Sequence, residues 1–410
     1  MPNRRTAVDE WGAQLMSPAQ AQGRIPAPIW ALGFVSLLMD VSSELIHSLL
    51  PVFMFTALGV SALTIGLIEG AAEATALIVK VFSGMLSDWW GKRKPLALLG
   101  YGLGAASKPL FALATGAGLV VTARLIDRVG KGIRGAPRDA LVADLTPPEV
   151  RGAAFGLRQA LDTVGAFLGP LLAMGLMLLW ANDFQAVFWA ATLPAFLAVA
   201  LLAFGVREPE RHQDGKRTNP IRRENLRRLP VAYWWVVGIG AVFTLARFSE
   251  AFLVLRAQQD GLPLAYTPLV LIAMNLVYAA SAYPLGRLAD TTSHVRLLAA
   301  GLVLLMLADA ALACGGPWIW AGIALWGLHL GMTQGLLATM VADVVPADLR
   351  GTAYGFFNLS CGLALLLASG LAGWLWDSFG AAFTFIAGGL FSGLTLVAIL
   401  LRSRPADPVR

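Results

Sequence analysis

The feature that most constrains this chain is a series of long apolar runs that recurs throughout its 410 residues. A helix that crosses the hydrocarbon core of a bilayer needs about 20 mostly apolar residues, and the sequence divides into twelve such runs. The first six lie near 29–56, 62–86, 95–114, 117–137, 152–180 and 184–205. The other six lie near 232–256, 266–288, 296–314, 317–342, 353–376 and 381–401. The pattern predicts an all-α integral membrane protein with twelve transmembrane helices.

The composition agrees with a protein whose main solvent is lipid. Hydrophobic residues make up 57% of the chain and charged residues only 14%, whereas a soluble protein of this size needs a more polar surface. The formal net charge of +6 comes from cations in the loops between apolar runs, so nucleic acid is not an expected partner. Cys314 and Cys361 lie far apart in the sequence, which predicts no disulfide framework, no metal site and no cofactor.

The distribution of Lys and Arg favours an orientation with both termini in the cytoplasm. With residue 1 on that side, nearly all loop cations also fall there, and Arg256 is the one exception. These cations are Lys92, Arg93, Lys94, Arg138, Arg151, Arg287, Arg296, Arg350, Arg402 and Arg404, together with the basic segment 207–228. Residues 1–27 lack the apolar core of a secretory signal. We therefore expect a multi-pass inner-membrane protein that retains its first helix.

Two sequence echoes indicate that the chain is an internal duplication. GMLSD at 84–88 recurs as GRLAD at 286–290, and ADLTPPEVRGAAFG from Ala143 recurs as ADVVPADLRGTAYG from Ala342. The echoes predict two six-helix bundles related by a pseudo-twofold axis. The expected divisions are a cytoplasmic tail (1–27), a first bundle (28–206), a cytoplasmic linker (207–231), a second bundle (232–402) and a cytoplasmic tail (403–410).

The loop after the second run, from Gly84 to Lys94, resembles the GxLaDrxGrkxxl motif of the major facilitator superfamily. In such a loop, glycines allow two helix ends to approach closely, and an aspartate can cap a helix or pair with a cation. The resemblance implies a conformational gate on the cytoplasmic side. The candidate gate residues are Gly84, Asp88, Gly91, Lys92, Arg93, Arg151, Asp290 and Arg350.

Two further motifs are similar to those of the drug/proton antiporter branch of the same family. The run that begins at Arg124 resembles RxxqGxGxa, whose arginine is implicated in proton transfer, although Asp127 and Arg128 replace the glutamine and the first glycine. The run that begins at Gly165 and includes Gly169 and Pro170 resembles GxxxGPxxGG, with Ala173 and Met174 in place of the last two glycines. Small residues four apart permit close helix contact, and proline favours a kink. The resemblance implies a secondary transporter that works by alternating access and favours export.

Ionisable residues within the apolar runs are candidates for proton coupling. Each costs several kcal/mol at bilayer depth unless it is paired or faces water. Asp40, Glu44 and His47 share one face of the first helix, and Glu69 and Glu73 share one face of the second. Burial favours a protonated carboxyl and a nearby arginine favours an ionised one, so protonation can follow conformation. The predicted proton-coupling residues are Asp40, Glu44, Glu73, Arg124 and Asp127. A static salt-bridge network is the structural alternative.

The second half carries fewer charges at bilayer depth. Arg247 and Glu250 are three residues apart and able to pair within the seventh helix, and Asp309 lies near an outer end. We expect ion coupling in the first half and a more apolar substrate surface in the second. The substrate-binding candidates are His47, Lys108, Arg128, Arg158, Asp162, Arg247, Glu250, Tyr278, Phe357 and Asn358. For Lys108, pairing with Glu69 or Glu73 is the preferred alternative.

Motifs that support enzyme chemistry are missing from the sequence, which contains no GxxxxGK[ST], HExxH or GxSxG. The preferred hypothesis is a monomeric, proton-coupled antiporter that exports a small organic molecule. An organic-anion carrier, for a carboxylate metabolite or siderophore, is the nearest rival because the Arg124–Arg138 stripe could bind acidic groups. A non-transporting receptor on a carrier scaffold is the rival from another class.

Overall fold

The computed structural model describes residues 25–147, 150–208, 228–333, 336–346 and 349–402. The expected terminal tails lie almost entirely outside these ranges, as does most of the expected linker. Within them, every regular element is a helix.

The first half contains one long helix for each predicted apolar run, with irregular turns at the end of the first. Its elements are α2 (Ala27–His47), α3 (Leu50–Val52), the π-helix η2 (Phe53–Ala57), α4 (Ala62–Trp90), α5 (Lys94–Ala112), α6 (Ala117–Leu145), α7 (Arg151–Leu179) and α8 (Phe184–Gly205).

The second half follows the same plan, but its first and fourth apolar runs are each described as two helices. Its elements are α10 (Val231–Ala246), α11 (Ala251–Gln259), the 3-10 helix η4 (Leu264–Tyr266), α12 (Leu269–Thr291), α13 (His294–Cys314), the 3-10 helix η5 (Gly316–Trp318), α14 (Ile319–Thr333), α15 (Leu336–Val344), α16 (Arg350–Phe379) and α17 (Ala381–Arg402).

Nine helical segments of the described chain are long and apolar enough to cross a bilayer. The elements outside this set are α5, α6 and the α14–α15 pair, which pack within the two bundles and complete six crossings in each. In α6 three charged side chains, Arg124, Asp127 and Arg128, are buried against protein. The predicted all-α membrane fold with twelve crossings is therefore confirmed.

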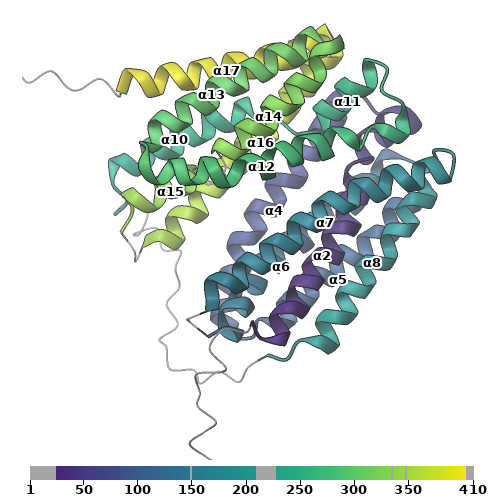
Figure 1. Ribbon diagram of the computed structural model, residues 1–410, viewed down its shortest axis with the longest axis vertical. Helices are drawn as coiled ribbons and strands as arrows, with labels where there is room; N and C mark the ends of the chain where they lie inside the picture. The colour runs from purple at the N-terminus through teal and green to yellow at the C-terminus, as the bar shows by residue number, and fades with distance from the viewer. Residues whose placement is uncertain (1–24, 148–149, 209–227, 334–335, 347–348, 403–410) are drawn as a thin grey trace, which may run out of the picture.

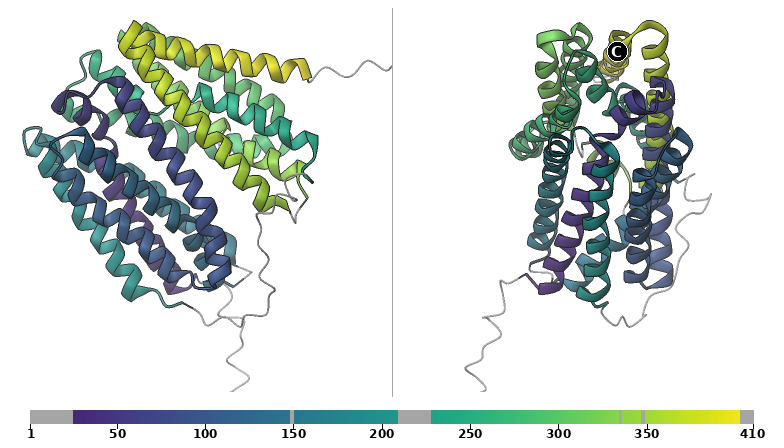
Figure 2. Two further views of the ribbon diagram at one scale, coloured as in Figure 1. Left: turned by 180° about the vertical axis from the view of Figure 1, so that it is seen from behind. Right: turned by 90° about the vertical axis from the view of Figure 1, so that its right-hand side faces the viewer.

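The two bundles repeat the same set of helix neighbours. In the first, the packed pairs are α2–α7, α2–α8, α4–α6, α5–α6 and α5–α8. In the second, the equivalent pairs are α10–α16, α10–α17, α12–α14, α13–α14 and α13–α17. Figures 1 and 2 show them as two separate groups, one coloured purple to teal and the other green to yellow. The duplication seen in the sequence is thus a duplication of the packing.

The halves contact each other mainly through α4 with α16 and α7 with α12. We call the end where α2 begins and α8 stops the terminal end, and the opposite end the far end; Figure 1 shows the bundles converging toward the far end. There a Cβ on Gly66 would lie 2.0 Å from the Ser369 carbonyl oxygen, so only glycine allows this approach. The Asp377 carboxylate of α16 also accepts hydrogen bonds from the backbone N–H groups of Ala62 (3.1 Å) and Leu63 (2.8 Å) at the start of α4.

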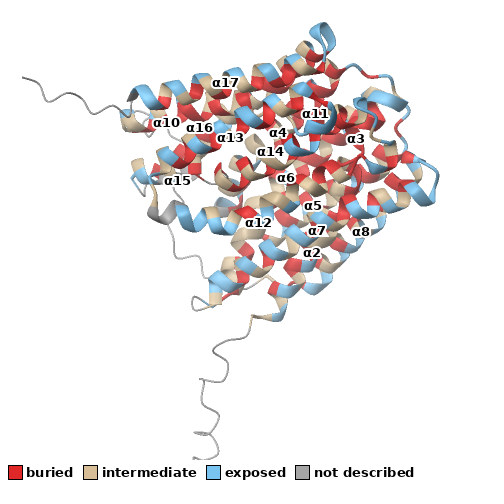
Figure 3. Cartoon of the chain, turned by 45° about the horizontal axis from the view of Figure 1, so that its top comes forward, coloured by how far each residue is buried: buried red, intermediate tan, exposed pale blue. Residues whose placement is uncertain are grey.

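The outer faces of the bundles are apolar, as a lipid environment requires. Phe204 is 87% exposed and Leu193 is 67% exposed, whereas Tyr101 and Trp326 are buried inside the bundles. Figure 3 shows buried residues along the inner helix faces and exposed residues on the outer ones. This distribution is that of a multi-pass membrane protein.

Candidate functional site

A cavity of about 680 Å³ lies between the two bundles. Its volume falls in the range of pockets that hold small molecules, roughly 300–1,000 Å³. Its wall is formed by α2, α3, α4, α6 and α7 of the first half and by α10, α11, α12, α14, α15 and α16 of the second. Both halves therefore contribute to a single site.

The two walls of the cavity differ in chemistry. Of the eight lining residues from the first half, five carry a charged or imidazole group: Glu44, His47, Glu69, Glu73 and Lys131. Of the eighteen from the second half, only Arg247 and Glu250 are charged. The other large side chains of that wall are mostly aromatic, including Phe243, Phe248, Tyr278, Trp326 and Phe357. The cavity thus faces an ionic wall on one side and an apolar wall on the other.

The centre of the ionic wall is the pair formed by Arg124 and Glu69. The guanidinium Nη2 of Arg124 donates to Glu69 Oε2 at 2.5 Å, and the two side chains are only 3% and 2% exposed. Nη2 also contacts the imidazole Nε2 of His47, which lies 3.4 Å from the same Glu69 oxygen. A charge-assisted bond in such surroundings is strong, and each member depends on the others because an unpaired charge there is costly.

A second pair extends this network toward the cavity. Arg128 Nη1 lies 3.1 Å from Glu73 Oε1, and Arg128 Nη2 lies 3.2 Å from His47 Nε2. Arg128 is 2% exposed but Glu73 is 31% exposed, so the carboxylate reaches the cavity while the guanidinium stays within the bundle. Glu44 lies 3.8 Å from His47 Nδ1, and both are about one quarter exposed. The network therefore meets the cavity at Glu44, His47 and Glu73.

Lys108 and Asp127 form a second buried pair, next to Arg128, whose Nε lies 3.6 Å from Asp127 Oδ2. Lys108 Nζ donates to Asp127 Oδ1 at 2.7 Å and to Ser43 Oγ at 3.1 Å. Lys108 and Asp127 are 1% and 4% exposed, and neither lines the cavity. The expected pairing of Lys108 with Glu69 or Glu73 is wrong, because those carboxylates are held by Arg124 and Arg128.

The glycines of the fifth-helix motif hold α7 against the face of α2 that carries the acids. A Cβ on Gly165 would lie 2.7 Å from the Leu37 carbonyl oxygen, and one on Gly169 would lie 2.7 Å from Glu44 Cβ. Pro170 lies next to Gly169 inside α7. The motif thus fixes the position of Glu44 through the distance between two helices.

Asp40 lies one helical turn from Glu44, toward the terminal end. It packs beside Gly165 and, among the described residues, has no cation within 4.0 Å of its carboxylate. Arg158 and Asp162 pair with each other at 2.5 Å, and Arg138 lies 3.9 Å from Asp162. None of these four side chains lines the cavity.

The pairing of Arg247 with Glu250 that the sequence allows does not form an ion pair within 4.0 Å in the described structure. The helix breaks between Ala246 and Ala251, so the two residues do not have the helical spacing that the pairing requires. The Arg247 guanidinium lies 5.5 Å from the centre of the Phe243 ring. Among the described residues, neither Arg247 nor Glu250 has a partner of opposite charge within 4.0 Å. The apolar wall therefore presents one cation and one anion, both unpaired, at a break in its first helix.

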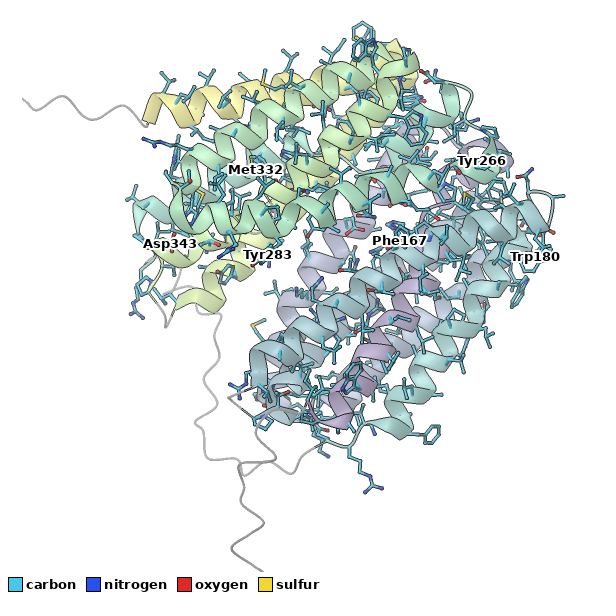
Figure 4. The ribbon with its side chains drawn as sticks, viewed as in Figure 1. Phe167, Trp180, Tyr266, Tyr283, Met332 and Asp343 are labelled. Atoms are coloured by element: carbon cyan, nitrogen blue, oxygen red, sulfur yellow. The ribbon has the colours of Figure 1, made fainter. Side chains whose placement is uncertain are left out.

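The structure brings together only half of the substrate-binding candidates. Those that line the cavity are His47, Arg247, Glu250, Tyr278 and Phe357. Those outside the cavity wall are Lys108, Arg128, Arg158, Asp162 and Asn358. Of the aromatic residues near the second-half helix ends, Tyr283 is 72% exposed and lies toward the terminal end near Asp343, as Figure 4 shows.

Glu69, Lys131 and Trp326 line the cavity but are not among the predicted site residues. The four-residue spacing of Glu69 and Glu73 does place both on one helix face. Trp326 lies in an apolar helix, and the sequence does not define which face of that helix points toward the cavity.

The candidate gate residues lie at the terminal end, and their gating role stays a prediction. Gly91 ends α4 with φ 71°, a conformation that favours glycine, and a Cβ on Gly84 would lie 3.3 Å from Ala136 Cβ. Arg93 Nε lies 3.1 Å from Asp144 Oδ2, and Lys92 and Arg151 are exposed. The side chains of Asp88, Asp290 and Arg350 lie outside the described residues.

Within the described ranges, no group of three or more His, Cys, Asp or Glu residues could hold a metal ion. The site instead combines buried ion pairs with a cavity between two equivalent six-helix bundles. This is the arrangement of a transporter that moves a small-molecule substrate between its halves.

Comparison with known proteins agrees. The sequence matches the family model for the Major Facilitator Superfamily over residues 32–369 and 261–410. The chain therefore belongs to the major facilitator superfamily and is a transporter rather than an enzyme.

Three relatives illustrate the range of similarity. The chain is 34% identical to an uncharacterized MFS-type transporter, MJ1317, of Methanocaldococcus jannaschii, over 90% of this chain and 94% of that protein. It is 26% identical to the multidrug resistance protein MdtH of Photorhabdus laumondii, over 89% of each chain. The crystal structure of a point mutant of the nucleoside transporter NupG superposes with a TM-score of 0.79 at 13% identity, over 92% of this chain and 100% of that one, which shows the shared fold.

Proposed function

We propose that this protein is a proton-coupled antiporter that exports a small organic molecule across the inner membrane, with both termini in the cytoplasm. The observation that carries the proposal is the buried Arg124–Glu69 pair at 2.5 Å, whose glutamate belongs to the wall of a cavity of about 680 Å³. Charged groups at bilayer depth are costly, so a network of them indicates function, and its exposed members give it access to protons. The similarity to MdtH, whose name describes a multidrug resistance protein, supports export.

The coupling step uses the carboxylates and guanidinium groups of the ionic wall. A proton that enters the cavity binds Glu73 or Glu44 and then Glu69, and each neutralised carboxyl loses its attraction for Arg128 or Arg124. The freed arginines favour a different arrangement of α4 and α6, and so a different relative position of the halves. Asp40 and Asp127, which lie away from the cavity wall, complete the proposed proton-coupling set.

The proposed orientation makes the terminal end cytoplasmic and the far end external. Arg256, the exception to the loop-charge rule, lies at the far end, where its guanidinium Nη1 is 3.0 Å from Asp260 Oδ1. This pairing neutralises its charge, so the far end carries little net positive charge from it.

Organic-anion transport is the second candidate. The Arg124–Arg138 stripe supports it poorly, since Arg124 and Arg128 are buried and held by carboxylates. Arg247 is a better observation in its favour, because it faces the cavity without a carboxylate partner among the described residues.

The test is flux in proteoliposomes with an imposed pH gradient, using lipophilic cations and carboxylates in parallel. We expect gradient-driven exchange in the native protein and its loss in Glu69→Gln. Asp139→Asn is the matched control, because Asp139 is an ion-paired carboxylate of α6 (3.1 Å from Arg138) that lies outside the cavity wall. If Glu69→Gln lowers thermal stability but leaves gradient-driven flux unchanged, the network is structural. If the native protein moves no substrate under any imposed gradient, the result contradicts the proposed antiport and favours the receptor hypothesis.

A further inference from the structure

Asp309 of α13 is the least satisfied ionisable group of the described chain. Its side chain is 1% exposed, and neither carboxyl oxygen has a hydrogen-bond partner among the described residues. A buried polar atom of this kind requires a physical explanation, and a carboxyl group at bilayer depth indicates function.

The surroundings of Asp309 are small and apolar. It packs against Gly388 of α17, where an added Cβ would lie 2.8 Å from Asp309 Oδ2 and 3.0 Å from Cε1 of Phe248. The Phe248 ring in turn lies 5.5 Å from the ring of Trp326, and both rings line the cavity. Asp309 thus lies on the far side of Gly388 from Phe248, an aromatic residue of the break between α10 and α11 that lines the cavity.

None of the neighbouring elements brings a counter-charge to this carboxyl group. The acidic, basic and histidine residues with described side chains on the elements around it are Arg247, Glu250, Arg256, Asp260, His294, Arg296, His329, Asp343 and Asp377. His329 is held by the Gly301 carbonyl oxygen at 2.7 Å, and Arg256 by Asp260 at 3.0 Å. No cationic group of this set lies within 4.0 Å of Asp309.

The first half carries a charged residue at the equivalent position, and there an ion pair neutralises the charge. The equivalent helix α5 carries Lys108 about four turns from its start, as α13 carries Asp309. Lys108 is balanced by Asp127 of α6, at 2.7 Å. The helix equivalent to α6 is α14, and it offers Asp309 no cation. An ionised carboxylate in this place would cost far more than a neutral one.

We propose that Asp309 is a second proton-binding site, which holds a proton in this conformation and exchanges it with the cavity when the Phe248–Trp326 wall opens. In that step the carboxyl O–H bond breaks and the proton passes to water in the cavity, leaving the carboxylate ionised. The exchange step rests on the proposed proton coupling, whereas the protonated state of Asp309 does not.

The protonated state is tested by infrared spectroscopy of the purified protein in lipid nanodiscs at neutral pH. The difference between native protein and Asp309→Asn should show loss of a carboxylic-acid C=O stretching band. Asp260→Asn is the control, and it should show loss of carboxylate bands instead, because Asp260 is ion-paired with Arg256. If the Asn variant does not elute as a folded protein, Asp309→Ser replaces it. Loss of carboxylate bands on substitution of Asp309 would overturn the proposal.

The exchange step is tested by the reversal potential of substrate flux in proteoliposomes. Asp309→Asn should lower the number of protons exchanged per substrate by one, with substrate binding retained. An unchanged proton number would overturn the exchange step. Loss of coupling in the Glu69→Gln variant is the separate test of the proposed function, so the two failures are distinguishable.

Discussion

The two halves of this transporter share one packing plan but present different chemistry to the cavity between them. The five main pairs of packed helices in the first bundle each have an equivalent in the second. Yet five of the eight lining residues from the first half carry a charged or imidazole group, against two charged residues of eighteen from the second. The fold is therefore compatible with either surface, and function depends on side chains that the repeat does not preserve.

The two halves also differ in how strongly their charged groups limit the arrangements that each half can adopt. In the first half, breaking one ion pair leaves a buried charge, so its network has few stable arrangements. In the second half, aromatic residues surround the cavity and two charges lie unpaired at a helix break. We expect the ionic wall of the first half to respond to protons from the cavity and the aromatic wall of the second to adapt to the substrate, with Asp309 as a further proton site behind the aromatic wall.

The largest effect is expected when the central cation of the ionic wall is removed, which tests whether the ionic wall couples transport to protons. Arg124→Gln should abolish gradient-driven transport and destabilise the protein by about 3–5 kcal/mol, because Glu69 is left as an uncompensated buried charge. Thermal unfolding in detergent and flux in proteoliposomes measure the two effects.

The double variant Glu69→Gln/Arg124→Gln serves as the control for charge balance. It should recover much of the lost stability without recovering transport, since both partners of the pair are then neutral. Transport by the single Arg124→Gln variant at the native rate would contradict a coupling role for the pair.

A smaller effect is expected from the packing that positions Glu44. Gly169→Ala places a Cβ 2.7 Å from Glu44 Cβ and 2.9 Å from the Val41 carbonyl oxygen, so α2 and α7 must separate. Such overpacking costs about 1–3 kcal/mol, and we expect at least a tenfold loss of coupled flux. Gly175→Ala in the same helix is the matched control, because nothing lies within 4 Å of the Cβ it adds. Equal effects of the two substitutions would show that close helix contact is not the cause.

The contact between halves at the far end should have a more moderate effect. Asp377→Ala removes both hydrogen bonds to the start of α4, and charge-assisted bonds contribute roughly 1.5–3 kcal/mol each in favourable cases. We expect a shift of population toward states in which the far ends of the halves are farther apart. Spin labels at positions 180 and 266 can report this distance, since Figure 4 places Trp180 and Tyr266 at the far ends of their respective halves.

The matched control for that experiment is Ser61→Ala. Ser61 Oγ accepts from the Thr64 N–H at 3.3 Å and so caps α4 from within its own half. Removing it weakens the same helix end without touching the contact between halves. A distance change as large as that of Asp377→Ala would assign the effect to the cap instead of the inter-half contact.

The sequence predicts much of the fold and less of the site, and particular residues show why. The twelve apolar runs and the two echoes predict the helices because burial in lipid requires length and composition alone. The partner of Lys108 depends on the rotation of α5 against α6, which hydropathy does not define. The Arg247–Glu250 pairing assumes a continuous helix, and the structure breaks it there. The sequence shows that Asp309 lies in an apolar run, but only the packing shows that it lacks a partner.

The smallest effect is expected from a substitution in the apolar wall, which tests whether that wall affects substrate affinity without affecting proton coupling. Arg247→Gln removes a cation that has no carboxylate partner within 4.0 Å among the described residues, so it leaves no buried charge behind and should not destabilise the fold. We expect an increase of about two- to threefold in apparent affinity for lipophilic cations, because a like charge in the cavity is removed and water screens it in part. The proton number per substrate should stay the same.

Lys131→Gln is the counterpart on the ionic wall, since Lys131 also lines the cavity. Its loss changes the charge balance around Glu44 and Glu73, so coupling should change as well as affinity. Reversal potentials and concentration series for both variants separate the two effects. If Arg247→Gln altered the proton number and Lys131→Gln did not, the assignment of coupling to the first half would be reversed, and the unpaired charges at the α10–α11 break would become the coupling site.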